Sequence, residues 1–183
     1  MTSERRSGTP DDVLVRLARD GDERALGTLV DRHHGVVYRL ALSMVSDPDV
    51  AQDVAQDAFI KAFRGLGGFR GDAAFRTWLL TITANTARGT LRRSGRRRET
   101  DLDAMSPLAA DAPDPSELAE RVDEAARARA LLDRLPEKQR LSVQLRIDEG
   151  LSFREIGEVI GSTEGAARVN YFHGIHRLRE WLE

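Results

Sequence analysis

The chain has 183 residues, of which 40% are hydrophobic and 32% are charged, and its formal net charge is −2. It contains no cysteine, which excludes disulfides, thiolate metal sites and cysteine nucleophiles and fits a reducing cytoplasm. No apolar stretch reaches the roughly 20 residues of a membrane span. The arginines near the start precede no apolar segment of the kind that a signal peptide needs. We therefore expect a cytoplasmic protein without a membrane span, whose residues 1–20 form a flexible tail.

The near-neutral sum conceals two blocks of opposite charge. Residues 86–99, TARGTLRRSGRRRE, are densely basic, whereas residues 99–124 are acidic with one arginine. Local charge governs contact with nucleic acid more than the net charge does. The basic block is therefore a candidate nucleic-acid contact in spite of the acidic total.

Helical signals dominate the first half of the chain. Residues 23–45 have apolar side chains at helical spacing, and Asp47 followed by Pro48 is typical of a helix N-terminus. Residues 49–66 continue the helical period and stop at a pair of glycines, and Asp72 is placed to cap the next helix. The candidate core residues of the first of these helices are Leu26, Leu29, Val30, Val37, Leu40 and Leu42.

Residues 99–114 contain prolines, alanines and aspartates without a helical period, so we expect a flexible linker there. Asp114 and Glu117 then form a capping-box pattern that opens the second half. The predicted fold is all-α, with two small helical domains joined by a flexible linker. Its predicted divisions are a tail at 1–20, a first domain at 21–98, a linker at 99–114 and a second domain at 115–183.

The last 32 residues have the order short helix, glycine turn and longer helix, which is that of a helix-turn-helix. Ser152 and Glu155 form a capping box for the short helix, and Gly161 supplies the turn. The inward residues of the short helix are Ile156, Val159 and Ile160. The predicted core stripe of the longer helix is Ala167, Tyr171, Gly174, Leu178 and Leu182. Its opposite face consists of Arg168, Val169, Phe172, His173 and His176.

That opposite face suits a DNA major groove, where apolar groups touch thymine methyls and arginine reaches guanine. The alternative is a helical hairpin whose outer face packs on the other domain. His173 and His176 are spaced as metal ligands can be, but no third ligand lies near them in the sequence, so phosphate contact or simple exposure is favoured.

Aromatic residues gather beside arginines in the stretch FRGDAAFRTW, residues 69–78. Five of the ten aromatic residues of the chain lie between Phe59 and Trp78. Aromatic surfaces combined with positive charge are what single-stranded nucleic acid binds. The alternative is that these aromatics are ordinary core residues and the arginines a solvated face.

Carboxylates recur every four residues at Asp49, Asp53 and Asp57. Such a stripe is usually solvated, and its second interpretation is a docking surface for a basic partner. The Glu-x-x-His pattern of carboxylate metal sites does not accompany it.

Both halves resemble the extracytoplasmic-function (ECF) group of sigma-70 family RNA polymerase sigma factors. DPDVAQDVAQDAFIKAFRGLGGFRGDAAFRTWLLTITANTARGTLRR resembles region 2 of that family, a helical bundle. LDRLPEKQRLSVQLRIDEGLSFREIGEVIGSTEGAARVNYFHGIHRLRE resembles region 4, a helix-turn-helix. The resemblance implies a protein that binds core RNA polymerase at the β′ clamp helices and the β flap, opens the promoter −10 element and reads the −35 element as duplex. It implies no catalytic residues, no metal and no cofactor.

The resemblance also assigns residues to these roles. Core polymerase binding falls to Asp53, Gln56, Asp57, Phe59, Ile60 and Phe63. Recognition and opening of the −10 element falls to Phe69, Arg70, Phe75, Arg76, Trp78, Asn85, Arg88, Arg92 and Arg93. The −35 element is read by Arg154, Arg168, Val169, Phe172, His173 and Arg177. An anti-sigma factor is an implied partner, which could mask both DNA surfaces and hold the protein at a membrane.

Two other functions stay open from the sequence. One is a stand-alone helix-turn-helix regulator that binds duplex DNA without polymerase, although such a protein has no use for the aromatic and basic stretch of the first domain. The other is an enzyme acting on nucleic acid. The sequence has no Walker loop, and GLGGFRG is not GxGxxG because Arg70 stands at the last glycine.

Overall fold

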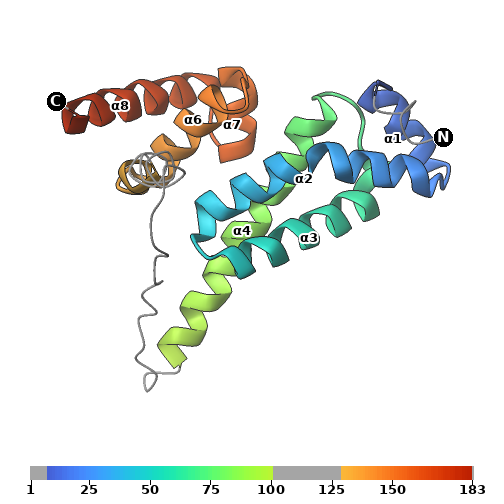
Figure 1. Ribbon diagram of the computed structural model, residues 1–183, viewed down its shortest axis with the longest axis horizontal. Coiled ribbons are helices and arrows are strands. Elements are labelled where there is room, and N and C mark those ends of the chain that lie inside the picture. Colours follow the sequence, from blue (N-terminus) through green and yellow to red (C-terminus); the bar gives the residue numbers. More distant parts are fainter. Residues whose placement is uncertain (1–7, 101–128, 183) are drawn as a thin grey trace, which may run out of the picture.

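The structure is a computed structural model that describes residues 8–100 and 129–182. The first group of elements consists of α1 (Asp11–Arg19), α2 (Glu23–Val45), α3 (Pro48–Gly65), the 3-10 turn η2 (Leu66–Gly68) and α4 (Phe75–Thr100). The second group consists of α6 (Glu137–Ile147), α7 (Phe153–Ile160) and α8 (Glu164–Leu182). Within these ranges the regular elements are all helical, as predicted (Figure 1). Most of the predicted linker, the capping box at Asp114 and the start of the second domain lie outside the described residues.

Residues 11–19 form helix α1, so the predicted tail at 1–20 is wrong for this stretch. Leu14, Val15 and Ala18 recur at helical spacing and are buried in the core of the first group. Asp11 and Asp12 lie in the first turn of the helix, where negative charge is favourable. α1 lies beside the N-terminal end of α2 (Figure 1).

Of the two helix starts predicted from capping residues in the first group, one is confirmed and one is wrong. Asp47 accepts hydrogen bonds from the N–H groups of Asp49 and Val50, and Pro48 opens α3, as predicted. The predicted cap at Asp72 is wrong, because α4 begins at Phe75. The carboxylate of Asp72 instead lies 3.1 Å from Nε of Arg70, in an exposed ion pair.

The core of the first group lies between α2, α3 and α4. Ala51, Ala55, Ala58 and Ala62 form a buried stripe of small side chains on α3, which lets its neighbours pack closely. Among the candidate core residues of α2, Leu29, Val37 and Leu40 are buried. The other three candidates are partly buried against the same core; they are Leu26, Val30 and Leu42.

The second group packs α6 and α7 against α8. Ile156, Val159 and Ile160 face inward as predicted. A side chain at Gly174 would place its Cβ 2.7 Å from Cγ2 of Val143, so α6 and α8 pack closely at this point. The predicted core stripe fails at Leu182, which is 73% exposed because it lies in the last turn of α8.

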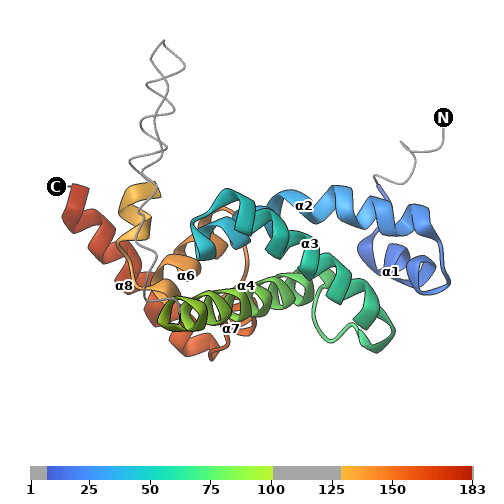
Figure 2. The same cartoon turned by 90° about the horizontal axis from the view of Figure 1, so that it is seen from below.

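The two groups are in direct contact through two pairs of helices. α4 packs against α7, and α2 approaches α6 (Figures 1 and 2). The sequence predicts only that the domains are tethered. This contact engages two of the candidate site residues, Arg76 and Arg88.

Candidate nucleic-acid interface

Three aromatic side chains from the FRGDAAFRTW stretch form one cluster at the start of α4. The ring centroids of Phe69 and Trp78 lie 4.9 Å apart, and those of Phe69 and Phe75 lie 5.9 Å apart in an edge-to-face arrangement. Phe75 is 4% exposed and also packs on the ring of His33 at 5.5 Å. Phe69 and Trp78 are half-buried. Phe75 is therefore the floor of the cluster, and only the other two rings keep surface open to a partner.

The segment that joins η2 to α4 carries the exposed part of this site. Arg70 is exposed, and Gly71 has a φ of 80°, a left-handed conformation that glycine adopts without strain. The backbone therefore turns sharply between Phe69, which lies in the cluster, and the exposed ion pair that follows it.

The polar site residues predicted on α4 divide into two sets. Neutral Asn85 and the two arginines Arg92 and Arg93 are exposed. Arg76 and Arg88 instead contact carboxylates of the second group, with Nε of Arg88 3.4 Å from a carboxylate oxygen of Glu137. Two of the arginines that the sequence assigns to DNA, Arg76 and Arg88, are thus paired with carboxylates of the second group.

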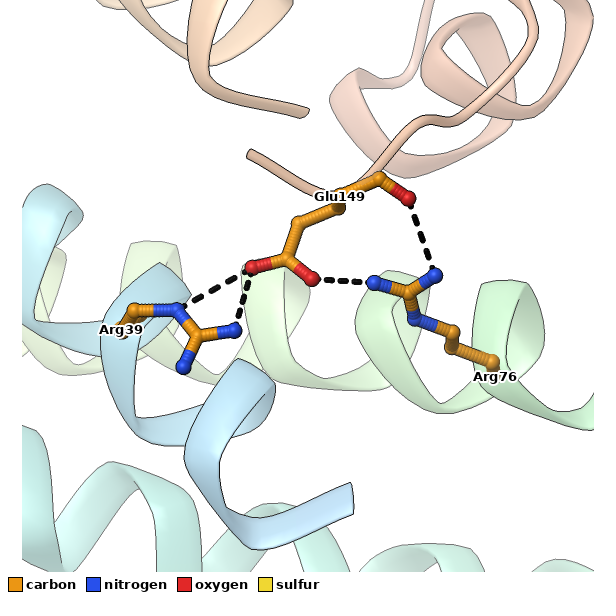
Figure 3. Close-up of polar contacts among 3 residues, drawn as sticks. All are labelled: Arg39, Arg76 and Glu149. Atoms are coloured by element: carbon orange, nitrogen blue, oxygen red, sulfur yellow. Dashed lines mark hydrogen bonds and ion pairs between the residues drawn. The ribbon is translucent and has the colours of Figure 1, made fainter. Parts of the chain in front are cut away.

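Glu149, in the turn after α6, lies between two arginines of the first group (Figure 3). Arg39 of α2 donates to its carboxylate from Nε at 3.1 Å and from Nη2 at 2.6 Å. Arg76 of α4 donates to the same carboxylate and, at 2.9 Å, to the backbone carbonyl of Glu149. The Glu149 side chain is only 8% exposed and that of Arg76 is 31% exposed, so the Arg76 bonds lie in a partly desolvated contact, whereas the Arg39 side chain is 60% exposed. Glu149 is not predicted from the sequence, because nothing in its local pattern signals a partner so far along the chain.

The capping box of α7 also joins the two groups. Ser152 N–H donates to Glu155 Oε2 at 2.8 Å and the Glu155 N–H donates to Ser152 Oγ at 3.3 Å, which confirms the predicted cap. Oε1 of Glu155 accepts a hydrogen bond from the buried hydroxyl of Thr77 on α4 at 3.0 Å. The hydrogen bond from the Ser152 hydroxyl is the main reason that the pKa of Glu155 lies below its usual value, and Thr77 lowers it further. Neighbouring Asp148 shows the opposite effect, because burial and then the charge of Glu149 raise its pKa.

The helix-turn-helix has the predicted geometry. Gly161 ends α7 with a φ of 65°, and the backbone of the following turn passes so close to Gly157 that a Cβ there would lie 3.0 Å from the Ser162 carbonyl oxygen. On α8, Val169 and Phe172 are 53% and 57% exposed, although both are apolar. The remaining predicted residues of this surface are also exposed; they are Arg154, Arg168, His173 and Arg177.

The interpretation in which the outer face of α8 packs on the other domain is therefore wrong, because α7 makes that contact. Within the outer face, Arg168 donates to Glu164 at 2.9 Å and lies over the ring of Phe153, with 5.3 Å between its Cζ and the ring centroid. Arg177 contacts Gln139 of α6 at 3.3 Å. This surface is preorganised and open.

The predicted polymerase-binding residues form a strip on α3. Asp53, Gln56, Asp57 and Ile60 are exposed, and Phe63 is half-buried beside them. Phe59 is 7% exposed and belongs to the core, so it supports the strip from within. In the described part of the chain, no three His, Asp or Glu side chains gather closely enough to hold a metal ion. Nor does any helix in these ranges combine the length and apolarity that a membrane crossing requires.

Comparison with known proteins gives one family. Residues 29–97 match Sigma-70 region 2, and residues 131–180 match Sigma-70, region 4. The chain is 38% identical over 182 residues to the RNA polymerase sigma-H factor of Pseudomonas aeruginosa, covering 94% of this chain and 92% of that protein. It is 36% identical over 181 residues to the ECF RNA polymerase sigma-E factor of Escherichia coli (strain K12), with the same coverage.

Two solved structures have a similar fold. One is CnrH in complex with the cytosolic domain of CnrY, at a TM-score of 0.70 and 27% identity, covering 94% of this chain and 96% of that chain. The other is the sigma factor RpoE in complex with the anti-sigma factor NepR from Bartonella quintana, at a TM-score of 0.69 and 22% identity, covering 85% and 95%.

Proposed function

The chain belongs to the sigma-70 family of RNA polymerase sigma factors, in its ECF group. From this membership we propose which surface of the chain binds each promoter element and which binds core polymerase. The first group of helices is region 2 and the second is region 4. As a specificity subunit the chain performs no chemistry of its own, and it acts in the cytoplasm, where polymerase and promoter are found.

The outer face of α8 reads the −35 element as duplex. The observation that carries this assignment is the exposure of Val169 and Phe172 next to Arg168 on the second helix of the helix-turn-helix. Apolar groups in this position touch thymine methyls, and an arginine beside them reaches guanine. Arg154 and Arg177, at the edges of the surface, hold phosphates.

The aromatic cluster and the basic face of α4 capture the separated −10 strand. Phe69 and Trp78 offer ring surface for stacking, whereas buried Phe75 supports them from below. Asn85, Arg92 and Arg93 provide polar and positive groups along the strand. Arg70 lies in the exposed loop beside the cluster.

Arg76 and Arg88 join this surface only after region 4 moves away from α4. A guanidinium binds carboxylate and phosphate oxygens with the same fork of donors, so Glu149 and Glu137 occupy the positions that DNA phosphates would take. The contact between the two groups therefore keeps part of the −10 surface closed.

The strip on α3 docks on the β′ clamp helices of core polymerase. Its carboxylates at Asp53 and Asp57 meet basic groups, and Ile60 supplies apolar contact. Region 4 docks on the β flap. An anti-sigma factor is a further partner, as NepR is for the similar sigma factor RpoE of Bartonella quintana.

Transcription by bacterial core RNA polymerase, with and without this protein, on promoter fragments from its own genome tests the proposal. We expect specific transcripts only when the protein is present, from sites that share two spaced elements. A protein that binds duplex DNA but neither binds core polymerase nor stimulates transcription would instead be the stand-alone regulator.

A further inference from the structure

The loop that carries the exposed part of the −10 surface has little regular structure of its own. The turn Leu66–Gly68 contains a backbone hydrogen bond from Phe69 N–H to the Leu66 carbonyl at 3.2 Å. After it the chain adopts the left-handed conformation at Gly71, and the pair of Arg70 and Asp72 is exposed to solvent. A base-capturing loop of this kind needs a support that fixes it before DNA arrives.

Arg19, the last residue of α1, provides contacts at both ends of this turn. Its Nε donates to the Leu66 carbonyl at 2.9 Å, and its Nη2 donates to the Phe69 carbonyl. A planar guanidinium can hold two carbonyl oxygens at once in a fixed geometry, which a lysine ammonium on a flexible stem cannot reproduce. The backbone of Phe69 is thereby held where its ring meets Trp78.

α1 is itself firmly anchored, so it can act as a support. Leu14 and Val15 are 0% and 2% exposed. Asp11 at the other end of the helix accepts from Arg32 and lies 2.8 Å from Nε2 of His33. The ring of His33 in turn packs under the aromatic cluster through Phe75. α1 therefore supports the aromatic cluster in two ways. Arg19 binds the carbonyls of the loop, and Asp11 binds His33, which packs against Phe75.

We propose that Arg19 is a positioning residue for the −10 loop, setting how sharply the captured bases are discriminated without itself contacting them. This inference rests on the proposed function of the loop. It gives a role to a helix that lies before the matched region 2 at 29–97.

The test uses the full chain bound to core polymerase and three variants, Arg19→Ala, Arg19→Lys and Arg16→Ala. Arg16 is the matched control, because it lies in the same turn of α1 and pairs only with exposed Asp12 at 3.5 Å among the described contacts. For each variant we would measure thermal unfolding, affinity for core polymerase, and binding to single-stranded −10 DNA from a promoter that the wild type opens. The same strand with one −10 base replaced measures discrimination.

We expect both Arg19 variants to lower the ratio of matched to mismatched binding about tenfold, the value of one or two charged hydrogen bonds. Unfolding temperature and core affinity should stay near wild type, and Arg16→Ala should match wild type throughout. A wild type that neither binds core polymerase nor stimulates transcription would refute the proposed function itself, before any variant is compared.

Three outcomes would overturn the role of Arg19 alone. The first is unchanged discrimination in Arg19→Ala. The second is full recovery in Arg19→Lys, which would mean that the residue supplies charge to a phosphate. The third is a parallel loss of folding or core binding in both Arg19 variants, which would mean that the residue is only structural.

Discussion

The two surfaces proposed to bind DNA differ in how exposed their arginines are. On α8, the side chain of Arg168 is 54% exposed and its pairing is with a neighbour on the same helix. On α4, the side chains of Arg76 and Arg88 are 31% and 23% exposed and pair with carboxylates of region 4. The proposed duplex-reading surface is thus open, whereas two arginines of the proposed strand-capturing surface are paired with carboxylates of region 4. If the proposed roles hold, duplex contact requires no rearrangement within the chain, whereas full strand capture requires the two regions to separate.

Substitution of Trp78 should distinguish the functions of the two surfaces most clearly. Trp78→Ala removes a stacking ring, and base–aromatic stacking is worth up to about 3 kcal/mol per base, so promoter opening should fall by about 100-fold. Binding of −35 duplex should be unchanged. A fluorescent base placed in the −10 element would report opening, and filter binding would report duplex affinity.

Trp78→Phe is the matched control for this experiment, because it keeps an aromatic ring beside Phe69. It should retain most of the opening activity. Equal losses of opening and of −35 binding in Trp78→Ala would contradict the division of labour between the two regions.

Substitution of Arg168 is the reciprocal test on the open surface. Arg168→Ala should cost about 2 kcal/mol of −35 affinity and relax the preference at one base pair, as expected for loss of an arginine contact to guanine. Strand capture measured on pre-opened −10 DNA should not change. Arg179→Ala, exposed on the same helix, is the control. A uniform loss across all duplex sequences would indicate that Arg168 contacts phosphate.

Weakening the contact between region 2 and region 4 should make the arginines of α4 more available, and so reduce the difference between the two surfaces. Glu149→Gln removes the charge that Arg76 and Arg39 share, and we expect the contact to weaken by about 1 kcal/mol, since Arg39 is well exposed. Binding of single-stranded −10 DNA by the free protein should then rise about fivefold. Small-angle scattering should show a larger radius of gyration.

The control for this variant is Glu158→Gln, because Glu158 is exposed on α7. It should leave both measurements at the wild-type value. Unchanged strand binding in Glu149→Gln, together with an expanded shape, would mean that the region 4 contact does not limit access to α4.

Much of the fold could be predicted from local sequence. The helical period and the caps at Asp47, Ser152 and Gly161 predict the positions of α2, α3, α7 and α8, because these signals act within one or two turns. α1 was missed, since its short apolar face follows a polar stretch of the kind that usually marks a tail. The apolar period also extended the core stripe to Leu182, where the helix no longer has a neighbour to cover it.

The site could be predicted only in part, because exposure and partners depend on contacts distant in sequence. Both Phe75 and Trp78 belong to the aromatic and basic pattern, but packing against His33 buries the first and leaves the second half-open. Likewise Arg76 meets Glu149 across 73 positions, and Arg19 meets Phe69 across 50. Such pairs have no local signal in a single sequence.

The anchoring of α1 by Asp11 should depend on pH. Burial acts to raise the pKa of Asp11, but the hydrogen bonds and charges of His33 and Arg32 outweigh it and hold this pKa below its usual value. A carboxyl whose pKa is lower in the folded state stabilises the fold above its unfolded-state pKa of about 4, and this stabilisation is lost as the pH falls through the folded-state value.

Asp11→Asn should therefore reduce the free energy of unfolding by about 1 kcal/mol near pH 7, and the difference from wild type should shrink below about pH 4. Urea titrations at several pH values measure this. Asp12→Asn is the control, because Asp12 is exposed beside it. Since α1 supports region 2, the loss should lower −10 strand binding and leave −35 binding intact. A difference that persists undiminished in acid would mean that the charge of Asp11 is not what anchors α1.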